Sequence, residues 1–108
     1  MTTPLTPTRG ELLYLSRLRK GLTVAEMARR RKVDLYTYQQ MERGEIDCHL
    51  REPITPLKPY EICRLLRRRN GMKQKDLAAK MGYSRLWVHK MESGKAPVVW
   101  LANFWGIQ

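Results

Sequence analysis

The sequence predicts an all-α protein made of two similar units of three or four short helices, with an apolar helix at the C-terminal end. Three observations support this fold class: the sequence repeats at a spacing of fifty residues, apolar residues recur at helical spacing, and capping residues stand where helices should begin and end. We expect the first, more divergent unit at residues 1–50, a linker at 51–58, and the second unit with the C-terminal helix at 59–108.

The repeat appears when the sequence is shifted by fifty residues, because residues 11–44 then align with 61–94 without a gap. Nine of these 34 positions carry identical residues, whereas about two are expected by chance at ordinary residue frequencies. The identities fall at positions 11, 15, 17, 19, 21, 28, 41, 42 and 44 and at their partners fifty residues later. One supersecondary unit is therefore predicted to occur twice.

The second unit carries start and stop signals for three helices. Pro59 suits the first position of a helix, where its missing N–H costs nothing, and Gly71 suits the end of that helix. A second helix is expected over residues 74–81, and Ser84 is a good N-cap for a third helix over 84–93. The residues expected to face the core are Ile62, Leu65, Leu66, Leu77, Ala78, Met81, Val88 and Met91.

The first unit repeats these signals with one exception. Thr23 and Glu26 form a capping box for its second helix, and Asp34 caps a third helix over residues 34–43. Lys32 stands where the second unit has its turn glycine, which costs stability if the turn needs a positive φ. The residues expected to face the core are Leu12, Leu15, Leu18, Tyr38 and Met41.

The segment 97–107 is too apolar for a free tail, and we expect a helix over 98–105. One face of this helix, with Leu101 and Trp105, should close the core of the second unit. The aromatic residues Trp100 and Phe104 belong either to a dimer contact or to the same core.

The charge of the chain is strongly positive. There are 21 Lys and Arg against 10 Asp and Glu, a formal net charge of +11. This excess draws a small protein to polyanions, because each phosphate that it neutralises releases condensed counterions. Residues 1–50 have nine basic and six acidic side chains, net +3, whereas residues 51–108 have twelve and four, net +8. The second half should therefore dominate attraction to nucleic acid.

Several other classes of protein are disfavoured. No apolar run approaches the roughly 20 residues of a membrane span and no signal segment opens the chain, so we expect a cytoplasmic protein without a membrane partner. The residues Cys48, His49, Cys63 and His89 match no usual spacing of paired zinc ligands, so no metal and no cofactor are expected. We also expect no enzyme, because the sequence has no nucleophile elbow and no phosphate-binding glycine loop.

Two segments of the second unit, QKDLAAKMGYS at 74–84 and VHKMESG at 88–94, strongly resemble the Cro/CI (XRE-type) helix-turn-helix of phage repressors. Residues 22–44 resemble it more weakly, and the two matches together cover roughly 70 of the 108 residues. The resemblance implies two tandem lambda-repressor-like helix-turn-helix units. In such a unit the third helix, called the recognition helix, enters the major groove of DNA.

The resemblance also implies roles for individual residues. An arginine of the first helix would pair with the glutamate that ends the recognition helix, which gives the pairs Arg17–Glu42 and Arg67–Glu92. Gln74 would touch a DNA phosphate with its side chain and its main-chain N–H. The other residues expected near phosphates are Lys73, Lys75, Ser93 and Lys95 and, in the first unit, Thr23.

The first turns of each recognition helix should carry the residues that read bases. Arg85 is the strongest candidate, because a guanidinium can donate two hydrogen bonds to guanine, worth about 1–3 kcal/mol of discrimination. Gln40 can pair with adenine in the same bidentate way, whereas Tyr36 and Tyr38 of the first unit can instead contact a partner protein. The full set of candidates is Ser84, Arg85, Leu86, His89 and Lys90 in the second unit and Leu35, Tyr36, Gln39 and Gln40 in the first.

These features together predict a sequence-specific regulator of transcription, from a phage or another mobile element, that binds double-stranded DNA at an operator or promoter. It would repress by blocking RNA polymerase or activate by recruiting it, either as a tandem monomer on two half-sites or as a homodimer. The alternative is a protein-binding module of the antitoxin or antiactivator type, in which one unit serves a partner or dimerisation. RNA binding is less favoured, because the sequence has no aromatic sheet motif for stacking bases.

Overall fold

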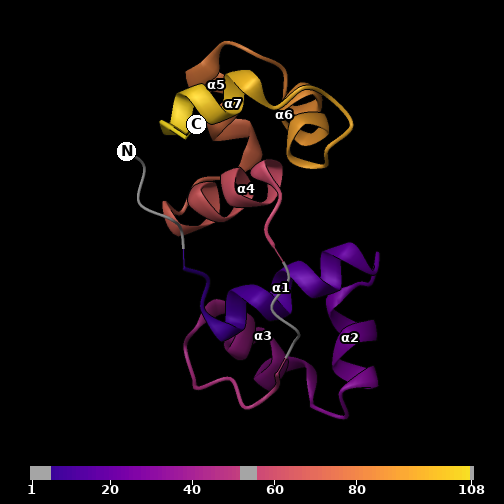
Figure 1. The fold of residues 1–108 in the computed structure, drawn as a ribbon. Helices are drawn as coiled ribbons and strands as arrows, with labels where there is room; N and C mark the ends of the chain where they lie inside the picture. The colour runs from indigo at the N-terminus through magenta and orange to yellow at the C-terminus, as the bar shows by residue number, and fades with distance from the viewer. Residues whose placement is uncertain (1–5, 52–55, 108) are drawn as a thin grey trace. The chain divides into compact units, whose positions relative to one another are not determined.

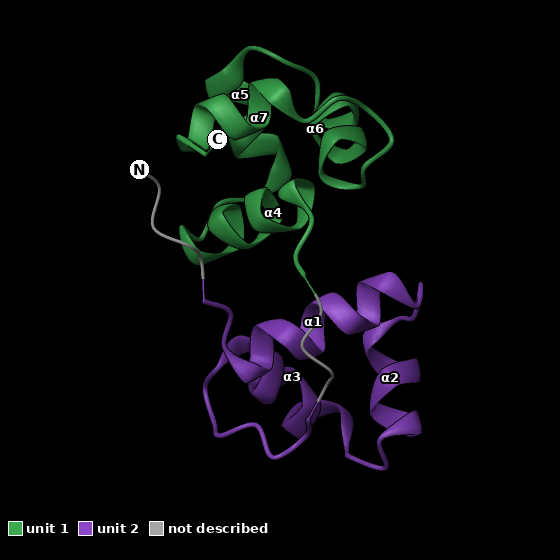
Figure 2. Cartoon of the chain, in the orientation of Figure 1, with its two compact units in different colours: residues 1–5, 56–108 green, residues 6–55 purple. Residues whose placement is uncertain are grey.

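The computed structural model describes residues 6–51 and 56–107 and divides the chain into two compact units. We call residues 6–51 the N-terminal unit and residues 56–107 the C-terminal unit; Figure 2 draws them in purple and green. The division falls within the linker predicted at 51–58, of which residues 52–55 lie outside the described part. Every regular element of the described residues is an α-helix, which confirms the predicted all-α fold class.

The N-terminal unit contains three helices (Figure 1): α1 (Arg9–Arg19), α2 (Val24–Arg30) and α3 (Leu35–Arg43). A side chain caps the start of each helix. Thr8 and Glu11 form a capping box at α1, and the predicted box of Thr23 and Glu26 at α2 is confirmed. The predicted cap of α3 is confirmed as well, because the Asp34 carboxylate accepts the main-chain N–H of the third helical residue at 3.0 Å.

The C-terminal unit contains four helices: α4 (Pro59–Arg69), α5 (Gln74–Met81), α6 (Arg85–Glu92) and α7 (Val99–Trp105). Pro59 is the first residue of α4, as predicted. Ser84 caps α6 by accepting the main-chain N–H of Trp87 at 3.2 Å, which confirms the predicted start of that helix. None of the described helices is both long and apolar enough to cross a membrane.

Each unit has its own apolar core between its helices. The buried cluster of the N-terminal unit consists of Leu13, Met27, Ala28, Tyr38, Met41 and Cys48. The buried cluster of the C-terminal unit consists of Cys63, Leu77, Ala78, Val88, Met91 and Leu101. The first five members of each cluster lie fifty residues apart in sequence, so corresponding positions build both interiors.

The inward face predicted for the first helix of each unit is partly wrong. Leu15 and Leu65 are buried as predicted, but Leu12 and Ile62 are only half-buried. The positions that meet the other helices are instead Leu13 and its equivalent in the other unit, a cysteine. Leu18 and Leu66, predicted to be inward, are likewise only half-buried, whereas the half-buried Met81 of α5 packs against the core as predicted. Apolar spacing alone cannot separate these faces, because apolar residues occupy neighbouring positions around α1 and α4.

The turn between the second and third helices has the same backbone conformation in both units. Gly82 has φ of +76° and Lys32 has φ of +57°, so both residues are left-handed. The expected strain at Lys32 is therefore present, because a side chain disfavours this region and glycine does not. This shared turn sets the direction in which α3 and α6 leave their units.

Candidate nucleic-acid interface

The helix α6 is held against α5 by a short turn and by its cap. Only Gly82, Tyr83 and Ser84 separate the two helices, and Gly82 ends α5 in the left-handed conformation. The α5 and α6 helices also pack against each other. Two short helices joined by a tight turn form the geometry that places a protruding second helix in a groove of DNA.

The side chains of α6 divide cleanly between an inward and an outward face. Val88, Met91 and Glu92 are buried. Trp87 is half-buried, and the exposed residues of the helix are four of the five predicted base readers, Arg85, Leu86, His89 and Lys90. Leu86 keeps 62% of its surface exposed although it is apolar. These four positions are spaced i, i+1, i+4 and i+5, so they share one side of the helix and form its outward face.

Buried polar contacts fix the C-terminal end of α6 to the rest of the unit. The Glu92 carboxylate is fully buried and lies 2.7 Å from the Arg67 Nε atom of α4. Arg67 also donates to the main-chain oxygen of Met72 at 2.8 Å, and Arg64 donates to the main-chain oxygen of Glu92. These contacts tie α4 and the segment that follows it to the end of α6 and so fix the direction of the outward face of α6.

Gln74 has a role that the sequence did not reveal. Its side-chain amide donates a hydrogen bond to the Glu92 carboxylate at 3.1 Å, and the residue is half-buried at the start of α5. The contact completes the polar anchor of α6. The side-chain amide, which we expected to touch a phosphate, is therefore already hydrogen-bonded inside the protein. Its main-chain N–H can still bind a phosphate without any rearrangement of the side chain, and this part stays a prediction.

The other predicted phosphate ligands flank the outward face of α6. Lys73 and Lys75 are exposed at the start of α5. Lys95 is exposed and Ser93 half-exposed just after the end of α6. Thr23, predicted from the first unit, uses its hydroxyl to accept the main-chain N–H of Glu26 at 3.1 Å, so its side chain serves as a helix cap.

The equivalent anchor in the N-terminal unit joins Arg17 to Glu42. The guanidinium donates from Nε at 2.8 Å and from a second nitrogen at 3.3 Å to the two carboxylate oxygens, and it also reaches the main-chain oxygen of Leu22 at 3.2 Å. Burial alone would lower the pKa of Arg17, but the hydrogen bond and charge of Glu42 raise that pKa above its ordinary value. Both pairs implied by the resemblance are thus present.

The outward face of α3 is chemically unlike that of α6. Leu35 and Tyr36 are 48% and 67% exposed at its start, and the predicted readers Gln39 and Gln40 are half-buried. Tyr38, the other tyrosine proposed for partner contact, is fully buried in the core, which excludes that role in this fold. Burial first, and then the neighbouring Glu42, raise the pKa of Tyr38.

The two units also differ in charge at the positions predicted to face DNA, of which the C-terminal unit has ten. Among them Lys73, Lys75, Arg85, Lys90 and Lys95 are basic and none is acidic, so their formal charge is +5. The ten positions fifty residues earlier sum to −1, because they hold one basic and two acidic side chains. Those earlier positions hold Thr23, Val24, Ala25, Asp34, Leu35, Tyr36, Gln39, Gln40, Arg43 and Glu45.

Aromatic residues lie beside the start of α6. An open hollow of about 400 Å³ is lined by Gly82, Tyr83, Ser84, Trp87 and Trp100. In α7, Leu101 is buried as predicted and Trp105 is half-buried, whereas Trp100 and Phe104 stay exposed. We expected Trp100 and Phe104 to belong either to a dimer contact or to the core, and their exposure shows that the second alternative is wrong.

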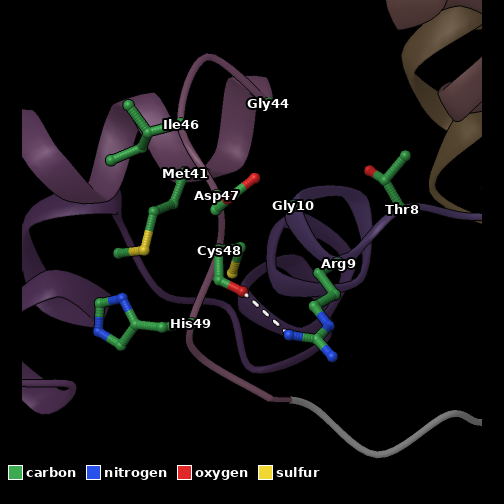
Figure 3. A pocket seen from close by; sticks show the side chains of 9 residues that line it. All are labelled: Thr8, Arg9, Gly10, Met41, Gly44, Ile46, Asp47, Cys48 and His49. Atoms are coloured by element: carbon green, nitrogen blue, oxygen red, sulfur yellow. Dashed lines mark hydrogen bonds between the residues drawn. The ribbon is translucent and has the colours of Figure 1, made fainter.

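A second hollow, of about 560 Å³, lies in the N-terminal unit between the start of α1 and the segment that follows α3 (Figure 3). Arg9 reaches across its edge and donates to the main-chain oxygen of Cys48 at 3.5 Å.

Cys48 and Cys63 are both free and buried. Within the described ranges, no three His, Cys, Asp or Glu side chains are grouped in a way that could hold a metal ion.

Comparison with known proteins finds one similarity, in the C-terminal unit. Residues 64–102 match the family model described as a helix-turn-helix domain, which spans the segment from the middle of α4 into α7. No curated protein and no solved structure gives a significant match to the chain. Residues 64–102 are therefore similar to a helix-turn-helix domain, a class of domain found in DNA-binding regulators.

Proposed function

We propose that this protein is a sequence-specific regulator of transcription that reads the major groove of double-stranded DNA with the outward face of α6. The observation that carries the proposal is the orientation of α6. Its inner side is fixed by the buried Arg67–Glu92 pair, while Arg85, Leu86 and Lys90 face outward together. A rigid helix that displays a cation beside an apolar side chain suits the mixed donor, acceptor and methyl pattern of the groove.

Each outward residue has a chemical role in this proposal. Arg85 donates two hydrogen bonds to guanine O6 and N7, and Leu86 packs against a thymine methyl group. His89 and Lys90, one turn further along α6, contact base edges or the adjacent phosphates. Ser84 keeps its cap hydrogen bond and places the first turn of the helix near the bases.

The flanking cations position the domain on the DNA backbone. Lys73 and Lys75 lie at the start of α5 and Lys95 lies after α6, and each would neutralise a phosphate. Such contacts fix the register of the helix in the groove without reading sequence. Occupancy of an operator in this way would block RNA polymerase or recruit it at the promoter.

The test is selection of bound sites from random double-stranded DNA, carried out at two salt concentrations. Wild-type protein should enrich a defined motif. Arg85→Ala should lose a guanine preference and about 10- to 100-fold in affinity for the selected site, which corresponds to one bidentate contact. Lys95→Ala should weaken all sequences alike and lower the slope of log affinity against log salt by about 1.

The matched control is Leu35→Ala, which changes the equivalent position of the N-terminal unit and should leave the guanine preference unchanged. Equal binding of scrambled and selected DNA by wild-type protein would contradict sequence-specific reading. The second candidate function, a protein-binding module, is favoured by one observation only, the exposed Leu35 and Tyr36 on α3.

A further inference from the structure

We propose that the N-terminal unit binds a second copy of this chain through the outward face of α3, with the two α3 helices antiparallel about a two-fold axis. The proposal goes beyond DNA reading by α6 and does not depend on it. It starts from the apolar side chains at the beginning of α3. Leu35 and Tyr36 are adjacent and 48% and 67% exposed, which is costly for side chains of this size in water.

The same surface is poorly suited to DNA. Asp34, at the start of α3, is exposed, and hydrogen bonds from the Thr37 side chain and main chain lower its pKa, so its carboxylate is charged at neutral pH. The equivalent residue of α6 is the neutral Ser84. Val24 likewise stands at the position of Gln74 and removes the polar group at the start of the second helix. A carboxylate beside two apolar side chains repels phosphate and favours a protein partner.

Charges of opposite sign lie at the two ends of α3. Before its start, Arg29, Arg30 and Lys32 are exposed and Arg31 is half-buried, and with Asp34 this end sums to +3. After its end, Glu45 and Asp47 are exposed, and with Arg43 this end sums to −1. Arg43 and Glu45 form only a long, exposed ion pair at 3.9 Å, so Glu45 is not sequestered. Anions beyond the end of a helix do not stabilise that helix, because its dipole disfavours them there.

This polarity identifies the partner. The nine residues of α3 span about 13 Å, which exceeds the Debye length of about 8 Å at physiological salt, so the two ends act as separate charged patches. An antiparallel second α3 places each basic end, together with the adjacent Leu35 and Tyr36, against the acidic end of the other copy. A surface that complements itself in this way closes as a two-fold dimer. The C-terminal unit lacks the acidic patch, because Lys95 and Pro97 occupy the equivalent positions.

The first test measures oligomeric state by sedimentation equilibrium of the full chain without DNA. Wild-type protein should approach twice the chain mass of 12.8 kDa, and the dimer should weaken as salt screens the charged ends. Tyr36→Glu should raise the dimer dissociation constant by at least about tenfold. The matched control is Leu86→Glu at the equivalent position of α6, which should leave the dimer intact. Far-UV circular dichroism checks that each variant keeps its helices.

The second test reverses charges. Arg30→Glu should weaken the dimer, and combining it with Glu45→Lys in the same chain should restore it, because each end then again meets its opposite in the partner. Lys80→Glu, at the position equivalent to Arg30, is the control and should have no effect. Restoration by the second reversal distinguishes an interface from a general loss of solubility.

Three results would overturn the proposal. The first is a chain that stays monomeric up to about 0.1 mM, beyond the range of most specific complexes. The second is a dimer that survives Tyr36→Glu but dissociates with Trp100→Glu, which would assign the interface to α7. The third is a changed base preference within a half-site in Tyr36→Glu, which would make α3 a base reader, because loss of the dimer by itself alters only the pairing of half-sites. Since dimerisation is measured without DNA, its failure leaves the proposal for α6 untouched, and failure of Arg85→Ala leaves the dimer untouched.

Discussion

The Arg67 guanidinium and the Glu92 carboxylate lie 2.7 Å apart, and Glu92 has no exposed surface at all. The pair joins the first helix of the C-terminal unit to the last residue of α6. Burying the charge of Glu92 costs free energy, and the hydrogen bonds that Arg67 and Gln74 donate to its carboxylate offset this cost. The direction of α6 therefore depends on a contact that lies outside the outward face.

Removing one member of this pair should be much worse than removing both. Arg67→Ala leaves a buried carboxylate without its counter-ion and should lower the free energy of unfolding by about 3–5 kcal/mol, whereas a double Arg67→Met, Glu92→Met variant should lose clearly less. Urea titration followed by tryptophan fluorescence is the measurement, because all three tryptophans, Trp87, Trp100 and Trp105, belong to the C-terminal unit. A single variant as stable as wild type would show that the pair contributes little.

The turn residues Lys32 and Gly82 should respond to substitution in opposite directions. Lys32→Gly should raise the stability of the N-terminal unit by about 1 kcal/mol, because a side chain at φ of +57° is strained and glycine is not. Gly82→Ala should lower that of the C-terminal unit by a similar amount, although nothing lies within 4 Å of the added methyl group. Hydrogen exchange resolved by residue reports both units in one experiment. Equal effects of the same sign would contradict the backbone explanation.

Gly10 should not tolerate alanine, even though it lies in a helix. A Cβ atom there would clash with the main-chain oxygen of Met41, so α1 and the end of α3 would have to separate. We expect Gly10→Ala to destabilise the N-terminal unit by about 1–3 kcal/mol, against the gain of about 1 kcal/mol that helix propensity alone would give. The change should appear as faster hydrogen exchange in α1 and α3, with α4 to α6 unaffected. A gain in stability would show that the close approach relaxes freely.

Cys63 should make the C-terminal unit less stable at alkaline pH. Burial first, and then the charge of Glu92, raise the pKa of this thiol from 9.0 to about 12. The folded state therefore favours the neutral thiol. Its contribution is fully present below about pH 9 and is lost as the pH rises toward 12.

The comparison with Cys63→Ala isolates this effect from other groups that titrate in the same range. Above pH 9 wild-type stability should fall more steeply than that of the variant, by at most about 1.4 kcal/mol per pH unit, the value for one proton. The thiol should also react slowly with a disulfide reagent at pH 8 until the protein is unfolded. Parallel pH profiles for the two proteins would refute the assignment.

The parts of the fold that sequence predicted well are those that local chemistry determines. Caps such as Ser84 and Asp34 act on main-chain groups three residues away, and a left-handed turn at Lys32 follows from its place in the repeat. The outward face of α6 was predictable for the same reason, because an eight-residue helix has few ways to bury Val88 and Met91 together.

The parts that sequence missed depend on contacts between elements. Nothing in the local sequence of Gln74 shows that Glu92, eighteen residues later, will accept its amide hydrogen bond. The inward turn of Cys63 and the tight approach at Gly10 likewise depend on how the first helix of each unit is rotated against the third. Rotation of a helix is decided by packing, which periodicity constrains only loosely.

The two interiors use corresponding positions, from Met27 and Leu77 to Met41 and Met91, while the outward faces of α3 and α6 share almost nothing. Residues that hold the scaffold together are thus physically separate from those that choose a partner. Replacing the exposed side chains of α3 with those of α6 would change the surface that the N-terminal unit presents to a partner and leave its buried core residues unchanged. In this chain, changing what a unit binds need not compromise whether it folds.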